Sequence, residues 1–167
     1  MATTFLHYLG TAGFTTNSGY IVAPFNMLGS TELSALANGS TAISSTGGTS
    51  GVFNQVIFGQ AQFALIWLTV VTASSIGSAG GNIAGWWIHG ANSSSTLEAF
   101  NATSGPARPP DWLIPLPNTA AVGSTFFATG VPALPYDTCK VLVQNNSGAT
   151  LGAGNHTITV APVADQY

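Results

Sequence analysis

Charged residues are what this sequence of 167 residues has least of, since they make up 4% of it, against about 25% in an average soluble domain. General acid and base pairs, metal clusters, phosphate clamps and basic nucleic-acid grooves all need ionisable side chains. The scarcity therefore argues against enzymes, against a metal or another cofactor, and against nucleic acid as a partner. The seven charged residues are Glu32, Glu98, Arg108, Asp111, Asp137, Lys140 and Asp165.

Cysteine is scarce as well, because Cys139 is the only one. No disulfide can form within the chain, and nothing indicates an oxidising compartment. A reactive thiolate needs positive charge nearby, and the sequence holds only two lysine or arginine residues. We therefore interpret Cys139 as a packed side chain in a strand.

Sequence motifs for catalysis or metal binding are missing too. His7, His89 and His156 have no second histidine, cysteine or carboxylate at metal-ligand spacing, and no G-x-S-x-G elbow is present. The glycine-rich segment 77–81 lacks the Lys-Ser/Thr pair of a phosphate-binding loop, so we interpret it as a turn. No catalytic, cofactor or metal residue is assigned.

Strand-forming residues dominate what is present. Val, Ile, Thr, Phe, Trp and Tyr recur, whereas strong helix formers such as Glu, Lys and Arg are nearly absent. With 46% hydrophobic residues and a net charge of −3, the chain is expected to fold around a core. Because the net charge is small, copies of the protein repel one another little. We therefore expect an assembled protein, either a dimer or trimer of itself or part of a larger structure.

The pattern changes near residue 51. Residues 1–51 are rich in small polar side chains, and we expect them to form an extended, mostly irregular N-terminal arm. Within the arm the sequence indicates a strand at 18–23, a helical turn at 31–37 capped by Ser30 or Thr31, and a polar loop at 38–51.

Residues 52–167 carry closely spaced strand signals separated by turns, which is typical of a β-sandwich of jelly-roll type. The residues Trp112 to Pro115, framed by prolines, are expected at an edge or in an interface. The other predicted strands are 52–58, 62–72, 82–89, 137–143 and 155–160, the last two as a closing hairpin.

One alternative is a membrane protein. Residues 56–73 are about as long as a membrane-spanning helix and contain no charge. Polar residues such as Gln60 and Gln62 interrupt the run, and its flanks lack the lysine and arginine that orient a span. We prefer buried strands and expect no membrane partner.

Aromatic and proline-framed residues are the candidates for partner contacts. Trp86 and Trp87 are neighbours on a predicted strand, so one indole is expected in the core and the other outward, facing a protein or a carbohydrate. Trp112 lies near the charges of Arg108 and Asp111, a combination that is favoured at interfaces. The full set of expected contact residues is Phe5, Tyr8, Phe14, Trp86, Trp87, Arg108, Pro110, Trp112 and Tyr136.

Several parts of the second half of the sequence resemble a known family, and these are Trp86–Gly90, Gly105–Leu116, Cys139–Gly148, Asn155 and Ala161–Tyr167. In these parts the chain resembles the small capsid decoration, or cement, proteins of tailed bacteriophages. The resemblance covers roughly residues 50–167 and implies a jelly-roll domain on the outer surface of the virion head. It also implies a protein that binds the major capsid protein across capsomer boundaries and stabilises the shell against packaged DNA. The family has no active site to carry over.

Two functions from different classes follow. The first is a structural virion protein that binds the capsid exterior and stabilises contacts between capsomers. The second is a carbohydrate-binding jelly-roll module, such as an adhesin, in which exposed tryptophans stack on sugar rings.

Overall fold

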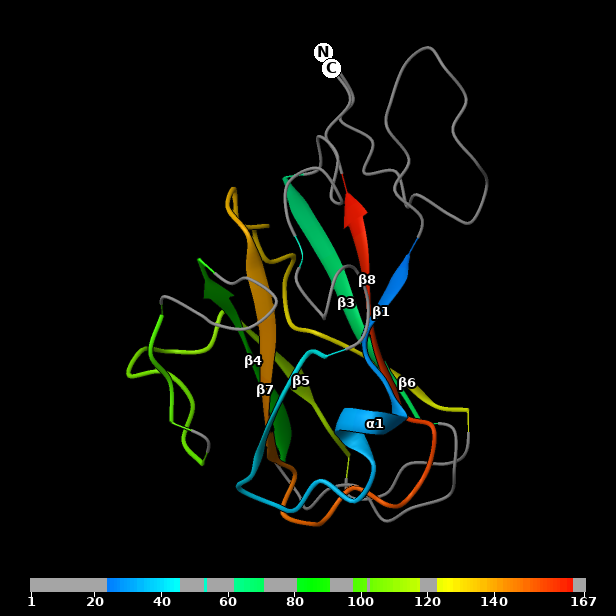
Figure 1. Cartoon of the computed structure of the whole chain (residues 1–167). Coiled ribbons are helices and arrows are strands. Elements are labelled where there is room, and N and C mark those ends of the chain that lie inside the picture. Colours follow the sequence, from blue (N-terminus) through cyan, green and yellow to red (C-terminus); the bar gives the residue numbers. More distant parts are fainter. Residues whose placement is uncertain are drawn as a thin grey trace.

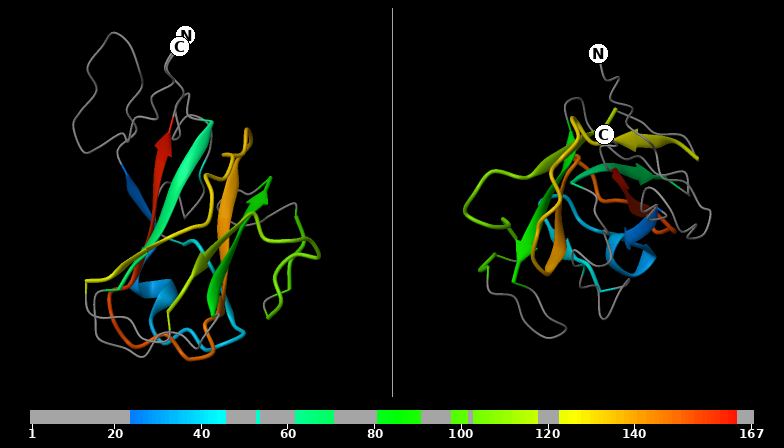
Figure 2. Two further views of the ribbon diagram at one scale, coloured as in Figure 1. Left: turned by 180° about the vertical axis from the view of Figure 1, so that it is seen from behind. Right: turned by 90° about the horizontal axis from the view of Figure 1, so that it is seen from above.

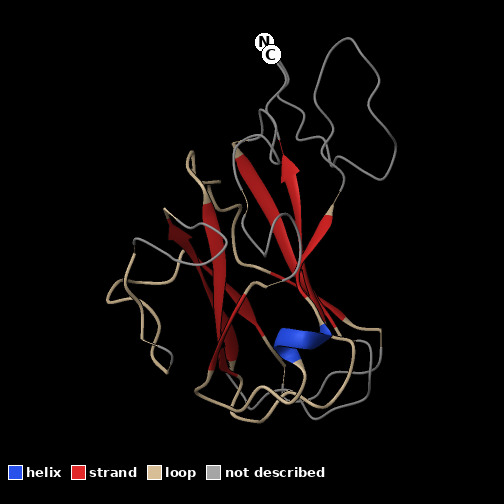
Figure 3. Cartoon of the chain, in the orientation of Figure 1, coloured by secondary structure: helices blue, strands red, loops and turns tan. Residues whose placement is uncertain are grey.

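The computed structural model describes residues 24–45, 53, 62–70, 81–90, 98–101, 103–117 and 123–163. Within these ranges the regular structure consists of strands and one short helix, joined by loops and turns (Figure 3). The predicted all-β class is confirmed. The elements in chain order are β1 (Phe25–Leu28), α1 (Ser30–Leu33), β2 (Thr41–Ile43), β3 (Phe63–Thr69), β4 (Asn82–His89), β5 (Trp112–Pro115), β6 (Thr125–Phe127), β7 (Cys139–Asn146) and β8 (Thr157–Val163).

The strands form two four-stranded sheets, in the orders β1-β8-β3-β6 and β2-β7-β4-β5 (Figure 1). Figure 2 shows these sheets as two layers. The first strand pairs with the last, the second with the seventh, the third with the sixth and the fourth with the fifth, all antiparallel. Such nested pairs, rolled into two sheets, are the jelly-roll arrangement. The predicted jelly-roll sandwich is confirmed.

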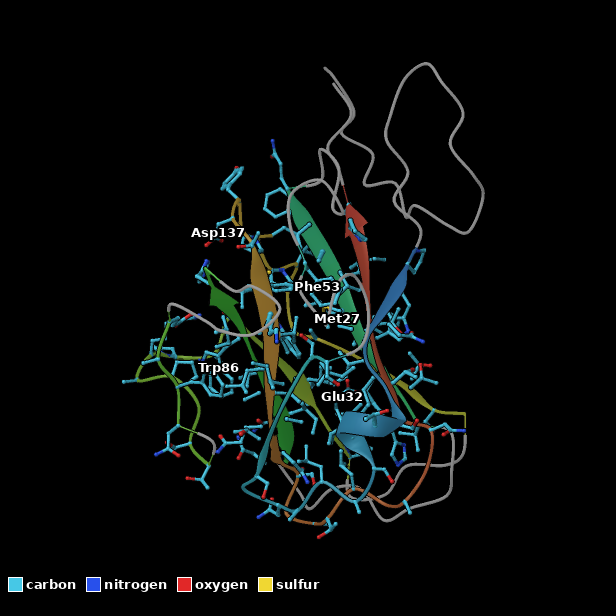
Figure 4. The ribbon with its side chains drawn as sticks, in the orientation of Figure 1. Met27, Glu32, Phe53, Trp86 and Asp137 are labelled. Atoms are coloured by element: carbon cyan, nitrogen blue, oxygen red, sulfur yellow. The ribbon has the colours of Figure 1, made fainter. Side chains whose placement is uncertain are left out.

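The core lies between the inward faces of the two sheets. Successive strand residues point to opposite sides, so Ala64, Ile66 and Leu68 of β3 face inward and are buried. Figure 4 shows Met27 and Phe53 between the layers. Phe53 is tied to the start of β7 by two backbone hydrogen bonds of 2.7 Å with Cys139.

The sandwich extends across the boundary that we expected between residues 51 and 52. Both β1 and β2 come from the segment expected to be an arm, and each is hydrogen-bonded into a sheet. The polar loop expected at 38–51 contains β2, which pairs with β7. These strands have only four and three residues, which is too short for the alternation of apolar and polar residues to give a strand signal. The strand expected at 18–23 lies outside the described residues.

The helical turn is found close to where it was expected, but its cap is different. Gly29, not Ser30 or Thr31, occupies the N-cap of α1. Its backbone N–H donates to Oε2 of Glu32 at 2.9 Å, which is the part of a capping box that the third helical residue supplies.

The expected closing hairpin is wrong, although both of its strands exist. β7 pairs with β2 and β4 in one sheet, whereas β8 pairs with β1 and β3 in the other. Alternation of apolar residues predicts a strand but not its partner. Near the end of β7, the amide Nδ2 of the buried Asn145 donates to the carbonyls of Leu36 and Ala149 at 2.8 Å each.

No helix among the described residues has the length and apolar character needed to cross a membrane. Part of the stretch considered as a span forms β3, in which buried and half-buried residues alternate.

Gly85 of β4 is a position where the fold requires the absence of a side chain. A Cβ atom there would overlap the six-membered ring of Trp112. We expect Gly85→Ala to lower the free energy of unfolding by about 1–3 kcal/mol, measured by urea denaturation, because the buried indole has to move.

Gly29→Ala is the matched control, because the nearest atom to its added Cβ is 3.9 Å away. Its cost should stay below about 1 kcal/mol. Equal costs for the two variants would contradict the packing described for Trp112.

Candidate interaction surface

The two adjacent tryptophans point to opposite faces of β4, as expected, but neither is available to a partner. Trp87 lies in the core with 3% of its surface exposed, and Trp86 lies on the outer face with 4% exposed. The chain itself covers Trp86, because Phe100 packs on its cluster and its indole Nε1 donates to the carbonyl of Arg108 at 3.2 Å. One indole thus faces the core and the other points outward as expected, but the expectation that the outward indole faces a partner is wrong. Figure 4 shows Trp86 between the sheet and the segment that contains Phe100 and Arg108.

Trp112 is likewise a core residue and not an interface residue. It begins β5, which is an edge strand as expected, but its side chain points inward against Gly85 and is buried. Pro110, just before the strand, is half-buried. The proline frame thus directs Trp112 into the sandwich.

Arg108 lies at the centre of a cluster of ionised side chains at the end of β4. Its Nε donates to Oε1 of Glu98 at 2.6 Å, and its Nη1 donates to Oδ1 of Asp111 at 2.7 Å. Its Nη2 donates to the backbone carbonyl of Trp87 at 2.7 Å. Arg108 was expected to contact a partner, and the structure instead places it in contacts within the chain.

These side chains complete the hydrogen bonding of β4 beyond the end of β5. The pairing of β4 with β5 ends at Gly85. Further along β4, the N–H of Trp87 donates to Oδ2 of Asp111 at 2.7 Å, and the N–H of His89 donates to Oε2 of Glu98 at 3.1 Å. Unsatisfied backbone groups are costly when buried, so the ionised side chains replace a missing strand. They also hold the segment that covers Trp86.

The pKa values follow from this arrangement. Burial acts to raise the pKa of the Glu98 carboxyl, but hydrogen bonds from Arg108 and His89 and the charge of Arg108 outweigh it, so this pKa lies below 4.5. The hydrogen bond to Glu98 is the main reason why the pKa of Arg108 is raised, with Asp111 adding to the effect. Glu98 and Arg108 therefore stay ionised at neutral pH.

A second polar contact, exposed to solvent, joins His89 and Asp137 and lies beside Tyr136. Nδ1 of His89 and Oδ1 of Asp137 are 2.8 Å apart, and Oδ2 of Asp137 accepts from the N–H of Gly90 at 3.1 Å. Burial acts to raise the pKa of Asp137, but the hydrogen bonds from His89 and Gly90 outweigh it and the pKa lies below its usual 3.8. Tyr136 itself is 79% exposed, so this expected contact residue is accessible.

The outer face of the other sheet carries apolar side chains and no charge. None of β1, β8, β3 and β6 contains a charged residue. Along β3 the residues Phe63, Leu65 and Trp67 point away from the core and are half-buried. Next to them, Phe127 of β6 is 56% exposed, and its ring centroid lies 5.8 Å from that of Trp67, with the planes tilted by 45°. We call these four residues the aromatic face.

Sequence reasoning missed the aromatic face because a strand that is apolar on both sides was interpreted as fully buried. The signal was present, since β3 reads Phe-Ala-Leu-Ile-Trp-Leu-Thr, in which Thr69 is the only polar residue. Such a strand has both faces covered in its working state, or exposes one of them to a partner. Phe5, Tyr8 and Phe14 lie outside the described residues.

Groups capable of chemistry are few in the described part of the chain. Cys139 is buried, and loss of solvation raises the pKa of its thiol to about 12, so it is not a nucleophile. His156 is buried as well, with Nε2 at 3.1 Å from the carbonyl of Gly152. No group of three or more His, Cys, Asp or Glu gathers to hold a metal ion among the residues described.

Comparisons with protein-family models, with curated proteins and with solved structures gave no match to this chain.

Arg108 provides a direct test of the ionic cluster. We expect Arg108→Gln to lower the free energy of unfolding by about 1–3 kcal/mol, because Glu98 and Asp111 lose their shared cation and the Trp87 carbonyl loses a donor. Urea denaturation measures the change.

Lys140→Gln is the matched control, since it also removes one positive charge and no ion pair joins Lys140 to another described residue. Its effect should stay within about 0.5 kcal/mol. If both variants lose the same stability, net charge and not the cluster is responsible.

Lowering the pH should lower the stability of the folded state. Glu98 and Asp137 have pKa values below their ordinary 4.5 and 3.8, so the folded state binds their protons less readily than the unfolded state does. Their contribution is fully present above about pH 5.5 and is lost as the pH falls through these pKa values. The urea midpoint should therefore decrease from about pH 5 to about pH 3, and less steeply in Glu98→Gln. A midpoint that rises over this interval would refute the account of the two carboxylates.

Proposed function

We propose that this protein is a non-enzymatic structural protein of a tailed-bacteriophage virion, which binds the outer surface of the capsid and stabilises contacts between capsomers. The observation that carries the proposal is the contrast between the two outer faces of the sandwich. One is covered by the chain itself at Trp86, and the other presents the aromatic face without a charge. A partially exposed apolar surface of this kind marks a site for another protein.

The chemistry of the aromatic face suits docking onto a flat protein surface. Binding through it leaves no charge to be stripped of water, which is the largest penalty in burying polar surface. Phe127 and Trp67 provide the large aromatic contacts that dominate binding energies at interfaces. A capsid presents the same subunit surface many times, so modest affinity for each site can suffice for high occupancy, and a dimer or trimer of the protein gains further avidity.

We propose the major capsid protein as the partner because the sequence resembles capsid decoration proteins, which bind it. The alternative, a carbohydrate-binding module, loses support because Trp86, Trp87 and Trp112 are buried. A sugar ring would have to stack on Trp67 and Phe127, whose planes are tilted by 45° and form no common platform.

Binding to capsids with and without the exposed ring tests the proposal. The purified protein is mixed with capsids lacking it, and occupancy after sedimentation is measured against concentration. We expect the wild type to co-sediment, and Phe127→Ser to bind at least about thirtyfold more weakly, as for the loss of a hot-spot aromatic residue.

Leu113→Ser is the matched control, because Leu113 is 37% exposed on the outer face of the other sheet. It should bind like the wild type. Absence of wild-type protein from the capsid pellet, together with binding to a glycan array, would reject capsid decoration in favour of the carbohydrate-binding alternative.

A further inference from the structure

The outer face of the sheet β1-β8-β3-β6 is open at β6 but buried along part of β8. In β8, Ala161 pairs with Leu65 of β3, and directly paired residues point to the same side of a sheet. Val163 pairs with Phe63 in the same way. Ala161 and Val163 therefore point outward, yet their exposed fractions are 0% and 2%, against 56% for Phe127. Figure 1 shows β8 in the middle of this sheet, between β1 and β3.

The strands beside β8 do not explain this burial. The outer face of an antiparallel sheet meets water unless a second layer covers it. On the other sheet the outward Ala84 is 3% exposed because it lies in the cluster that Phe100 packs against. Ala161 and Val163 belong to neither apolar cluster of the described residues. Both are buried within a single chain, so their cover is a part of that chain outside the described ranges.

The burial deepens toward the C-terminal end of β8. On the outward side Thr157 is half-buried, and Thr159 is 7% exposed. Oγ1 of Thr159 donates to Oδ1 of Asn26 at 2.8 Å, and Asn26 on the edge strand β1 is exposed. The cover therefore lies over Ala161 and Val163 and ends before Thr157 and Asn26.

Residues 1–23 approach the sheet at this same end. β1 runs antiparallel to β8, and its first residue, Phe25, pairs with Val160. The chain that precedes Phe25 therefore joins the sheet from the side of Val163. An extended chain advances about 3.3 Å per residue, so residues 1–23 are more than long enough to cross the end of β8.

The composition of residues 1–23 suits an apolar cover. This segment contains no Asp, Glu, Lys or Arg, and Phe5, Tyr8 and Phe14 are among its large apolar side chains. Such residues can be buried against Ala161 and Val163 without loss of hydration from a charge.

The two other stretches that meet the sheet at this end are less suited. Residues 54–61 connect Phe53, which is bonded to β7, with the start of β3, so they have to span from one sheet to the other. Residues 164–167 include Asp165, whose charge is costly to bury beneath an apolar layer.

We infer that residues 1–23 lie on the outer face of β8 of the same chain, with apolar side chains against Ala161 and Val163. The N-terminal segment thus borders the aromatic face and limits the surface that is open to a partner to the side of Trp67 and Phe127. The inference does not depend on the proposed function, because it concerns contacts within the free protein.

Photo-crosslinking of the free, full-length protein tests this. The photoreactive residue p-benzoylphenylalanine replaces Phe5, Tyr8 or Phe14, one at a time, and an equal mixture of isotope-labelled and unlabelled protein is irradiated. Mass spectrometry identifies the joined peptides. We expect at least one of these positions to join the peptide that contains Ala161 and Val163, with the same isotope in both peptides.

Three results of this experiment would overturn the inference. They are crosslinks to β8 that join peptides of different isotope, crosslinks only to other parts of the chain, and no crosslink from any of the three positions. The first would assign the cover to a second copy of the protein.

Val163→Asp tests the contact from the side of the sheet. A carboxylate beneath an apolar cover should displace it, so chymotrypsin should cleave after Phe5, Tyr8 and Phe14 severalfold faster than in the wild type. The near-ultraviolet circular dichroism of the tryptophans should stay unchanged, which shows that the sandwich is intact. Thr157→Asp is the matched control, because Thr157 is outward on the same strand but half-buried, and it should be cleaved like the wild type. Equal cleavage of Val163→Asp and the wild type would also count against the inference.

Discussion

The guanidinium group of Arg108 makes the interaction on which one outer face of the sandwich depends. It joins Glu98 and Asp111 and donates to the backbone of β4 where β5 no longer does. Without it, two carboxylates would lie together beside unsatisfied backbone groups. With it, the segment after β4 closes over Trp86. Glu98, Arg108 and Asp111 are three of the few charged residues of this chain, and they lie where β4 no longer has β5 as a neighbour.

The scarcity of charged residues also explains the contrast between the two outer faces of the sandwich. In the sheet β2-β7-β4-β5 the outward apolar residues Trp86, Ile88 and Leu142 are buried by the chain's own segment. In the sheet β1-β8-β3-β6 the strands contain no charged residue, and Phe127 remains mostly exposed. The scarcity of charged residues thus leaves one surface of the sandwich suited to protein contact.

Sequence patterns predicted the positions of strands better than they predicted which strands pair and which side chains the chain covers. The predicted strand 82–89 has the bounds of β4, because turn residues flank a dense apolar run. The partners of β7 and β8 were not predictable, since pairing across sheets depends on contacts distant in sequence. Burial of Trp86 and Trp112 was missed for a related reason: alternation gives the face of a side chain but not what covers it. The clustering of Glu98 with Arg108, ten residues apart in irregular chain, has no sequence periodicity that signals it.

The central claim is that the aromatic face is covered by another protein in the working state. Hydroxyl-radical footprinting of the free protein and of capsid-bound protein measures this residue by residue. The account predicts that oxidation of Trp67 and Phe127 falls severalfold on binding, while oxidation of Leu113, on the opposite sheet, stays as in the free protein. Unchanged oxidation of Trp67 and Phe127 in fully occupied capsids would contradict it.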